Sequence, residues 1–394
     1  MPQPPDGQPA PPDGALPASA LAAVGARPLG VYVHVPFCLS RCGYCDFNTY
    51  TSGDRGAYVA AALAEIDLAA RVLHAGGRRP PVATVFLGGG TPTLLAPEQI
   101  GALLARIDAR LGLAADAEIT VEANPDSVDA AALEALRAAG VTRMSFGVQS
   151  VREHVLAALE RSHGPRRALA AIREARAAGF HGVSADLIYG TPGEDDGDWR
   201  ASLEAVLEAG ADHVSAYALT VEPGTRLHAQ VRRGERPAPD PDTLADRYAA
   251  ADALLAEAGL AWYELSNWAR DPGHRCRHNL GYWRSHDWWG IGPGAHSHVA
   301  GTRWWNVAHP ARYAAALAAG RSPSRARETL DARTRRLERV MLEVRLAEGL
   351  NRDLCDPAAL ERLAAGGLLR VDDGRAVLTL RGRQVADAVV RALA

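Results

Sequence analysis

The stretch that decides the fold is VYVHVPFCLSRCGYCDF, residues 31–47, in which an apolar segment runs directly into a cysteine-rich loop. The apolar part, residues 30–35, is made of β-branched and aromatic residues between Gly and Pro, a pattern that predicts a buried strand. Three of the chain's five cysteines follow it, at Cys38, Cys42 and Cys45. The cysteines are therefore expected on a loop at the carboxyl end of a strand.

The unit of strand followed by helix is repeated along the chain. Five further strands are predicted, at residues 84–88, 118–123, 143–148, 182–189 and 213–219. Helical patterns such as residues 97–113 lie between them. This alternation predicts an α/β fold in which a parallel sheet is wrapped by helices, and six such units, within residues 29–265, are expected to form a partial or complete β/α barrel.

The two ends of the chain differ from this repeat. Residues 1–28 are rich in Pro, Ala and Gly and are expected to form a disordered tail. Residues 266–306 are expected to form a linker segment. Residues 307–394 are predicted to form a C-terminal winged-helix-like α+β domain, because a helix at 333–349 precedes a strand, an Asp-Gly turn, a strand and a helix.

Composition limits the kinds of partner. The 394 residues are 47% hydrophobic, and 43 basic residues are scattered among 46 acidic ones for a net charge of -3. Without a basic stripe, the C-terminal unit is expected to pack or dock, and no nucleic-acid partner is predicted. No apolar run reaches the roughly 20 residues of a membrane helix and no signal peptide is recognised, so we expect a cytoplasmic protein with at most peripheral membrane association.

Polar and glycine-rich residues collect at the carboxyl ends of the predicted strands. GGGTPT (88–93), Glu122, Gln149 and Asp186 follow or end the second to fifth strands. In a β/α barrel, loops at this edge converge on one mouth. Carboxylates within apolar strands are costly without partners, so a bound polar or cationic ligand is expected, with the glycines letting backbone groups approach it.

The C-x3-C-x2-C spacing suits a cluster that needs several thiolates at one point. Structural zinc is the alternative, but it takes four ligands, and the nearby His34 lies within the strand. A 4Fe-4S cluster held by Cys38, Cys42 and Cys45 instead leaves one iron without a protein ligand. The cluster is therefore the preferred interpretation.

These residues resemble the radical S-adenosylmethionine (SAM) superfamily, in which the open iron binds SAM and an electron from the cluster cleaves it to a 5′-deoxyadenosyl radical. The motifs HxPFCxxxCxYCDF, GGGTPT, ExNP, SxGVQS, ERxH and DLIYGxPG together are similar to the oxygen-independent coproporphyrinogen III oxidase group, from about residue 30 to the C-terminus. The resemblance implies a partial (β/α)6 barrel with a 4Fe-4S cluster on the three cysteines. It also implies SAM contacts from Tyr32, Tyr44, Gly89, Gly90, Thr91, Glu122, Gln149, Arg161 and Asp186, and it leaves open whether one or two SAM molecules bind.

Two features depart from the oxidases of this group. Phe47 stands where they have a further cysteine, and residues 278–283 (HNLGYW) resemble the HNxxYW motif of heme chaperones related to the oxidase. The resemblance implies heme binding by His278, Tyr282 and Trp283, with His278 on the heme iron and Cys276 as an alternative ligand. The implied partners are heme-accepting proteins such as respiratory-chain components, and an electron donor if SAM is cleaved.

Three functions stay open. The preferred one is a heme chaperone that keeps a cluster and a SAM site. The second is radical decarboxylation of coproporphyrinogen III to protoporphyrinogen IX, and the third is radical SAM chemistry on another substrate, so no catalytic residue is assigned. For the segment 275–298 an interdomain cap is the alternative to a heme site; His286, His296 and His298 are expected to be structural, and Cys355 is expected in a core.

Overall fold

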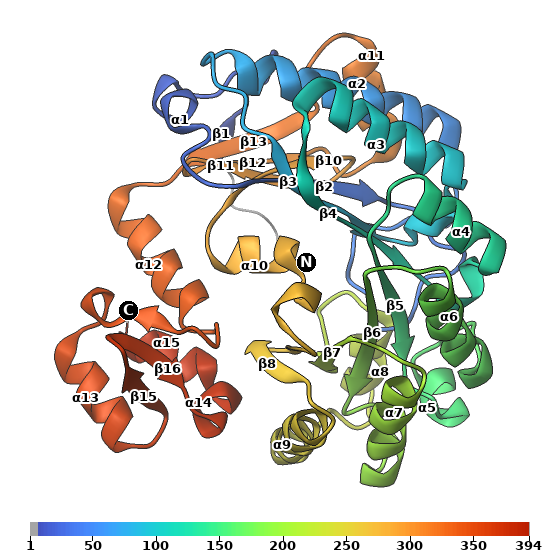
Figure 1. Ribbon diagram of the computed structural model, residues 1–394, viewed down its shortest axis with the longest axis vertical. Coiled ribbons are helices and arrows are strands. Elements are labelled where there is room, and N and C mark those ends of the chain that lie inside the picture. Colours follow the sequence, from blue (N-terminus) through green and yellow to red (C-terminus); the bar gives the residue numbers. More distant parts are fainter. Residues whose placement is uncertain (1–6, 394) are drawn as a thin grey trace.

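The computed structural model describes residues 7–393, and a continuous 13-stranded sheet forms the centre of its larger part (Figure 1). Its centre is six parallel strands that are neighbours in chain order: β2 (Leu29–Val35), β3 (Val82–Gly89), β4 (Leu113–Ala123), β5 (Arg143–Gln149), β6 (Gly182–Tyr189) and β7 (His213–Ala218). All six strands predicted from the sequence are present. The α/β class and the partial barrel are thereby confirmed.

The helices that connect these strands cover the outer face of the sheet (Figure 1). They are α2 (Arg55–His74), α3 (Pro97–Leu111), α4 (Ala130–Ala138), α5 (Glu153–Ala158), α6 (Pro165–Ala177) and α7 (Asp196–Glu208). Two further helices, α8 (Arg226–Arg232) and α9 (Pro241–Glu257), follow β7. Several begin where an aspartate accepts a hydrogen bond from a free N–H of the first turn, as Asp54 does from Ala57 and Asp129 from Ala132. Short 3-10 turns follow β3 and β4, at η1 (Pro92–Leu94) and η2 (Pro125–Ser127).

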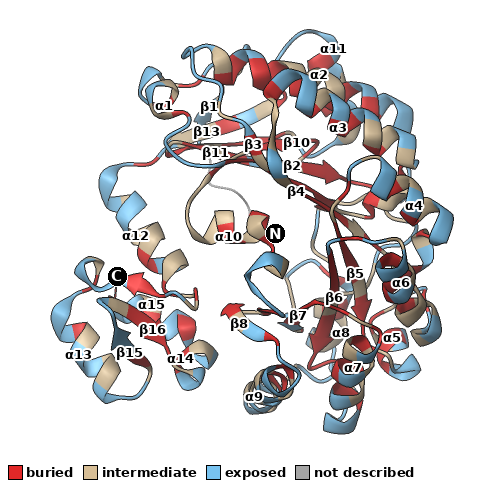
Figure 2. Ribbon diagram, in the orientation of Figure 1, coloured by how far each residue is buried: buried red, intermediate tan, exposed pale blue. Residues whose placement is uncertain are grey.

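Side chains alternate between the two faces of each strand. On β2 the valines at 31, 33 and 35 are fully buried under the outer helices, and Figure 2 shows the central strands buried along their length. The opposite, concave face carries polar residues, as Arg143, Ser145 and Gln149 do on β5. The hydrophobic core therefore lies between sheet and helices, and the concave face is free to form a site.

The sheet extends beyond the barrel strands on both sides. Next to β2 lies β10 (Asp287–Ile291), which is parallel to it, and then the antiparallel strands β11 (His296–Val299), β12 (Thr302–Asn306) and β13 (Ser324–Thr329). On the far side of β7 lie β9 (Asn267–Ala269) and β8 (Ala261–Glu264). The helix α11 (Pro310–Ala318) packs on α2.

This extension corrects two predicted boundaries. Residues 266–306 are not a linker, because most of them continue the sheet. The C-terminal unit begins after Leu330 and not at residue 307, because β13 pairs with β12 along its length. Pairing between strands far apart in the chain decides both boundaries, and local patterns do not reveal it.

The expected tail is also ordered where it is described. The strand β1 (Gln8–Pro9) pairs with β13, and α1 (Ala18–Ala23) follows. Leu16, Ala20 and Val24 are buried in the main core. A few spaced apolar side chains anchor this Pro-rich segment, while residues 1–6 lie outside the described part of the chain.

The C-terminal unit forms a second, smaller core, at the lower left of Figure 1. Its sheet has the order β14-β16-β15, with the Asp373-Gly374 turn of the predicted hairpin between β15 and β16. The elements are α12 (Ala332–Glu343), β14 (Leu350–Asn351), η4 (Arg352–Leu354), α13 (Pro357–Ala365), β15 (Leu369–Asp372), β16 (Arg375–Leu378), α14 (Leu380–Gln384) and α15 (Ala386–Leu393). Cys355 is buried in this core, as expected.

One helix lies on the concave side of the barrel: α10 (Arg277–Trp283), preceded by η3 (Pro272–His274). Figure 1 shows it in the hollow of the half-barrel, across from β3 and β4. Among the helices of residues 7–393, none is both long and apolar enough to cross a membrane.

Candidate functional site

A cavity of about 430 Å³ opens on the concave face, at the carboxyl ends of the parallel strands. Eleven of the predicted site residues line it: Cys38, Cys42, Tyr44, Cys45, Gly89, Gly90, Thr91, Glu122, Gln149, Arg161 and Asp186. They come from four of the parallel strands, β3 to β6, and from the segments that follow β2, β3 and β5. The fold therefore brings together residues that were singled out one by one from the sequence.

The cysteine loop is fixed to the end of β2 by backbone hydrogen bonds. The N–H of Cys38 donates to the carbonyl of Tyr50 (3.0 Å), and the N–H of Tyr50 donates to the carbonyl of Pro36 (2.7 Å). His34 Nε2 bonds the carbonyl of Asn48 (2.9 Å), and its Nδ1 bonds the hydroxyl of Tyr32 (3.0 Å). His34 therefore holds the base of the loop and is not presented to the thiols as a zinc ligand.

The three thiols line the same cavity without closing around a single ion. No group of three His, Cys, Asp or Glu within residues 7–393 is placed to hold one metal ion. Thr91 Oγ1 donates to Cys38 Sγ (3.9 Å) and Arg161 Nη1 donates to Cys42 Sγ (3.3 Å). Burial raises the pKa of the Cys38 and Cys45 thiols. Three sulfurs that line one cavity suit a cluster held by several thiolates.

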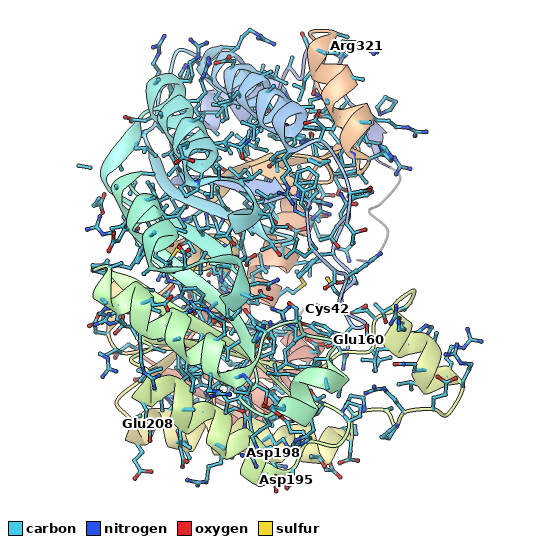
Figure 3. The ribbon with its side chains drawn as sticks, turned by 90° about the vertical axis from the view of Figure 1, so that its right-hand side faces the viewer. Cys42, Glu160, Asp195, Asp198, Glu208 and Arg321 are labelled. Atoms are coloured by element: carbon cyan, nitrogen blue, oxygen red, sulfur yellow. The ribbon has the colours of Figure 1, made fainter. Side chains whose placement is uncertain are left out.

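Figure 3 shows Cys42 beside Glu160 at the edge of the barrel. The carboxylate of Glu160 is near enough to Gly43 that a Cβ on that glycine would lie 3.0 Å from it. Glu160 also accepts two hydrogen bonds from Arg226 Nη1 (3.1 Å each), and it has a positive φ of 56°. The loop after α5 thus supports the cysteine loop from outside.

The glycines of the GGGTPT segment make room mainly for protein atoms. A Cβ on Gly90 would lie 2.5 Å from the carbonyl oxygen of Phe37, and one on Gly88 would lie 2.7 Å from Glu122 Oε2. The N–H of Gly90 donates to the carbonyl of Val35 (2.8 Å), and that of Thr91 to Phe37 (2.7 Å). The sequence predicts that these glycines admit a ligand; in the structure, Gly88 and Gly90 instead let β3 approach the cysteine loop and Glu122 closely.

Two carboxylates project into the cavity. Glu122 Oε2 accepts from the N–H of Gly89 (3.2 Å), and Asp186 accepts from Ser145 Oγ with both oxygens (3.1 and 3.0 Å). Burial and the nearby Asp186 raise the pKa of Glu122 to about 7, and burial raises the pKa of Asp186. The cavity therefore favours a cationic or hydrogen-bond-donating guest over two free anions.

The rim also holds a cation and a strained residue. Arg161 Nη2 donates to the carbonyl of Gly147 (3.0 Å) and to Asn124 Oδ1. Gln149, at the end of β5, is buried with a positive φ of 65°, which a non-glycine residue adopts only at a cost. A strained, buried amide at a cavity is a frequent property of ligand sites.

Tyr32 is not among the residues that line the cavity. It lies behind the lining, with its ring 6.4 Å from Phe86 and 6.5 Å from His278 between centroids. Burial and the charge of Glu122 raise its pKa well above the usual value, so its hydroxyl is a neutral hydrogen-bonding group. It orients His34 and therefore the cysteine loop.

The predicted heme residues do not face an open site. His278 is 3% exposed; its Nδ1 bonds Thr84 Oγ1 (2.8 Å), its Nε2 bonds the hydroxyl of Tyr282 (2.8 Å), and its ring stacks on Phe86 at 5.2 Å. Both ring nitrogens are engaged within the protein. The role of His278 as a heme-iron ligand stays a prediction, and it requires one of these two hydrogen bonds to break.

The other candidates in this segment are packed as well. Trp283 packs with Tyr263 and Leu280, and Cys276 is buried with its pKa raised to about 12 by burial, so it is a neutral thiol. His298 Nδ1 bonds the carbonyl of His286 (3.2 Å) and His296 lies against Trp305, consistent with the structural roles expected for these histidines. The interdomain cap and the heme site both stay predictions for this segment.

Sequence reasoning missed the polar residues deeper in the cavity. They are Arg143, Ser145, His213, Ser215 and Asn279. A signal existed: polar residues recur at every second position of strands that were read simply as apolar, as in RMSFGVQ and HVSAYA.

Comparisons with known proteins agree with this geometry. The model of the radical SAM superfamily matches residues 32–206. The chain is 53% identical over 381 residues to the heme chaperone HemW of Mycobacterium tuberculosis, covering 95% of this chain and 96% of the relative. It is 32% identical to the heme chaperone HemW of Bacillus subtilis, covering 91% and 97%.

Among solved structures, the coproporphyrinogen III oxidase (HemN) from Escherichia coli, a radical SAM enzyme, superposes with a TM-score of 0.80 at 25% identity. The match covers 97% of this chain and 94% of the other. The family assignment rests on the 53% identity to the Mycobacterium tuberculosis HemW along nearly the whole of both chains. The chain therefore belongs to the HemW family of the radical SAM superfamily, in the group related to HemN.

Proposed function

We propose that this protein is a heme chaperone that carries a 4Fe-4S cluster and SAM and delivers heme to acceptor proteins, respiratory-chain components among them. The observation that carries the proposal is the 53% identity to a heme chaperone over almost the entire chain. Phe47, which is 54% exposed at the mouth of the cavity, supports it, because the oxidases of the group resemble this chain but have a cysteine there.

The cavity provides groups for both cofactors. Cys38, Cys42 and Cys45 would hold the cluster, which when bound supplies one-electron chemistry to SAM. Glu122 and Asp186 are placed to accept hydrogen bonds from a ribose or an amino group, and Arg161 is placed to bind a carboxylate. The other predicted SAM contacts line the same cavity, except Tyr32, which lies behind the lining: Tyr44, Gly89, Gly90, Thr91 and Gln149.

An oxidative decarboxylase of coproporphyrinogen III is the second candidate. It is favoured by the superposition with HemN over nearly the whole chain and by the cavity that the SAM-type residues share. The difference at Phe47 counts against it. The two candidates differ in what becomes of a tetrapyrrole: the chaperone retains and transfers it, and the oxidase converts it.

Anaerobic reconstitution of the full chain tests the proposal. We expect four irons per chain, one heme bound per chain by absorbance titration, transfer of that heme to an apo-hemoprotein, and no carbon dioxide from coproporphyrinogen III with SAM and a reductant. Steady decarboxylation with no stoichiometric heme binding would establish the oxidase instead. A Phe47→Cys variant, which restores the cysteine of the oxidases, is the matched comparison for turnover.

A further inference from the structure

Arg143 is the first residue of β5 and lies at the floor of the barrel. Its side chain faces the cavity, yet only 5% of the residue is exposed. Gly182 on β6 lies beside it: a Cβ there would be 3.3 Å from the Arg143 Cγ, so the absence of a side chain leaves space for the methylene stem. The guanidinium is therefore carried deep into the cavity by a close-packed stem.

This guanidinium lacks the partners that buried arginines usually have. Nε has no hydrogen-bond acceptor, and within residues 7–393 Arg143 takes part in none of the ion pairs. A buried charge is normally paired, because taking it out of water without hydrogen bonds is costly. An unpaired one that faces a cavity needs an explanation.

The nearest carboxylates are engaged elsewhere. Glu118 Oε2 accepts from the N–H of Arg277 (2.9 Å), and its Oε1 accepts from the N–H of His278 (3.0 Å). Asp186 accepts from Ser145 with both oxygens. These groups attract Arg143 electrostatically, but their lone pairs serve α10 and the wall of the barrel. The hydrogen-bonding capacity of the guanidinium therefore remains directed at the cavity.

The cavity has an arginine at each end. From Arg143 at the floor to Gln149 at the rim, β5 rises roughly 20 Å at about 3.3 Å per residue. At the rim, Arg161 already donates to Asn124, Gly147 and Cys42. At the floor, Arg143 is free to donate, with the amide-bearing Asn279 of α10 lining the same cavity. A ligand that reaches the floor of the cavity could accept hydrogen bonds from the N–H groups of the Arg143 guanidinium.

We propose that Arg143 binds a carboxylate of the molecule that occupies the cavity. A planar guanidinium pairs with a carboxylate through two parallel N–H···O bonds, which satisfies both groups. Two sources carry this chemistry: the propionate of a tetrapyrrole and the α-carboxylate of a second SAM molecule, bound away from the cluster. The propionate source rests on the proposed function, whereas the SAM source does not.

Pairing each ligand with a carboxylate-free counterpart tests the proposal. Arg143→Gln and the control Arg166→Gln, an exposed arginine on α6, are titrated with hemin, hemin dimethyl ester, SAM and decarboxylated SAM. We expect Arg143→Gln to lower the affinity for one of the two carboxylate ligands, hemin or SAM, by about tenfold or more. The affinity for the matching ligand without the carboxylate should change less than about twofold. Arg166→Gln is expected to leave the affinities for all four ligands unchanged.

The outcomes separate the sources. If Arg143→Gln loses affinity for hemin only, Arg143 binds a propionate. If it loses affinity for SAM only, Arg143 binds the α-carboxylate of SAM. The proposal would be overturned if Arg143→Gln changed the affinity for each carboxylate ligand no more than that for its carboxylate-free counterpart. It would also be overturned if the affinities for hemin and for SAM both stayed unchanged. If the wild-type protein binds no heme, the chaperone function fails, and the SAM pair alone decides the role of Arg143.

Folding is checked with the same variants. Because the Arg143 guanidinium has no hydrogen-bond partner in the ligand-free protein, Arg143→Gln is expected to keep or raise the Tm of that form. Arg143→Lys, which keeps the charge but not the fork, is expected to retain part of the affinity. A lower Tm together with unchanged ligand affinities would make Arg143 structural and contradict the proposal.

Discussion

Gly90 shows how a single residue links the two loops of the site. Its N–H donates to Val35, and no side chain would fit between it and the carbonyl of Phe37. The peptide of the GGGTPT segment therefore lies directly on the start of the cysteine loop. The position of the cysteine loop is therefore tied to that of the GGGTPT segment through the backbone.

Glu122 gives a prediction about pH. Its pKa is raised to about 7 in the folded protein and is about 4.3 in an unfolded chain. Below about pH 4 both states bind the proton. As pH rises from there through 7, the unfolded state loses it first, so this group lowers the free energy of unfolding. We expect Glu122→Gln to be more stable than the ligand-free wild type by about 1–2 kcal/mol at pH 8, with a smaller difference at pH 5.

Denaturant unfolding of both proteins at pH 5, 6, 7 and 8 measures this difference. Comparing wild type with variant cancels the contributions of other buried carboxyl groups whose pKa is also raised, such as Glu65 and Glu194. A difference that is constant with pH, or that shrinks as pH rises, would show that the Glu122 carboxyl is not held protonated by its surroundings.

At the residue scale, the sequence predicted the rim of the cavity better than its floor. Glu122 and Asp186 stand out because carboxylates are rare in apolar strands. Arg143 lies at the beginning of RMSFGV, where a basic residue looks like a solvent-exposed strand end. Only the curvature of the sheet, which turns that end toward α10, makes it a buried group.

The helix α10 is the element that closes the barrel floor. Glu118 on β4 accepts from its first two N–H groups, and Arg277 Nη1 donates to the carbonyl of Asp116 (2.7 Å). A carboxylate at a helix N-terminus satisfies free donors and complements the helix dipole. The HNLGYW motif thus forms a helix that is fixed to the base of the barrel. Asn279 lines the cavity, and His278 contacts Thr84 and Phe86 of β3.

Thr84 allows the anchoring role of His278 to be separated from heme ligation. Thr84→Val removes the hydroxyl that bonds Nδ1 but leaves the imidazole in place. We expect Thr84→Val and His278→Ala each to lower stability by about 1–3 kcal/mol, because buried polar groups lose partners. We expect each to change heme affinity by less than about threefold.

Thermal unfolding and heme titration of the two variants provide the measurement. If His278→Ala abolishes heme absorbance while Thr84→Val retains it, the imidazole is an iron ligand after all, and α10 must leave the floor to present it. Equal and small effects on heme would identify His278 as an anchor of the floor.

At the element scale, the six barrel strands could be predicted because each is a short apolar run ended by Gly, Pro or polar residues. The strand β10 could not. Its sequence, DWWGI, lies within a segment rich in His and Trp that suggested ligand binding, and it pairs with β2, as Trp289 does with Val31. No local pattern reveals a partner more than 250 residues away.

At the scale of the whole molecule, the C-terminal unit is attached to the barrel by a small set of polar contacts. Arg383 on α14 donates to both carboxylate oxygens of Asp252 on α9 (2.8 and 2.6 Å). Its guanidinium also lies over Trp262, 4.3 Å from the ring centroid. Elsewhere Arg284 pairs with Glu348 (2.8 Å), where both partners are more exposed.

The Arg383 contact is expected to carry much of this attachment. The arginine is nearly buried, so its bidentate pair and its stacking on Trp262 are little screened by water, unlike the exposed pair of Arg284. Arg383→Met should therefore cost about 1–3 kcal/mol of coupling between the units. Because each unit has its own hydrophobic core, the loss is expected to split unfolding into two transitions, with that of the C-terminal unit first.

Differential scanning calorimetry of Arg383→Met, with the exposed Arg381→Met on the same helix as control, tests this division. The iron content after reconstitution should be equal in both, because the cysteine loop belongs to the barrel core and not to the C-terminal unit. A single transition, shifted no further than in Arg381→Met, would mean that apolar contacts such as those of Leu346 with Tyr263 and Leu280 hold the units together, and that Arg383 contributes little to the attachment.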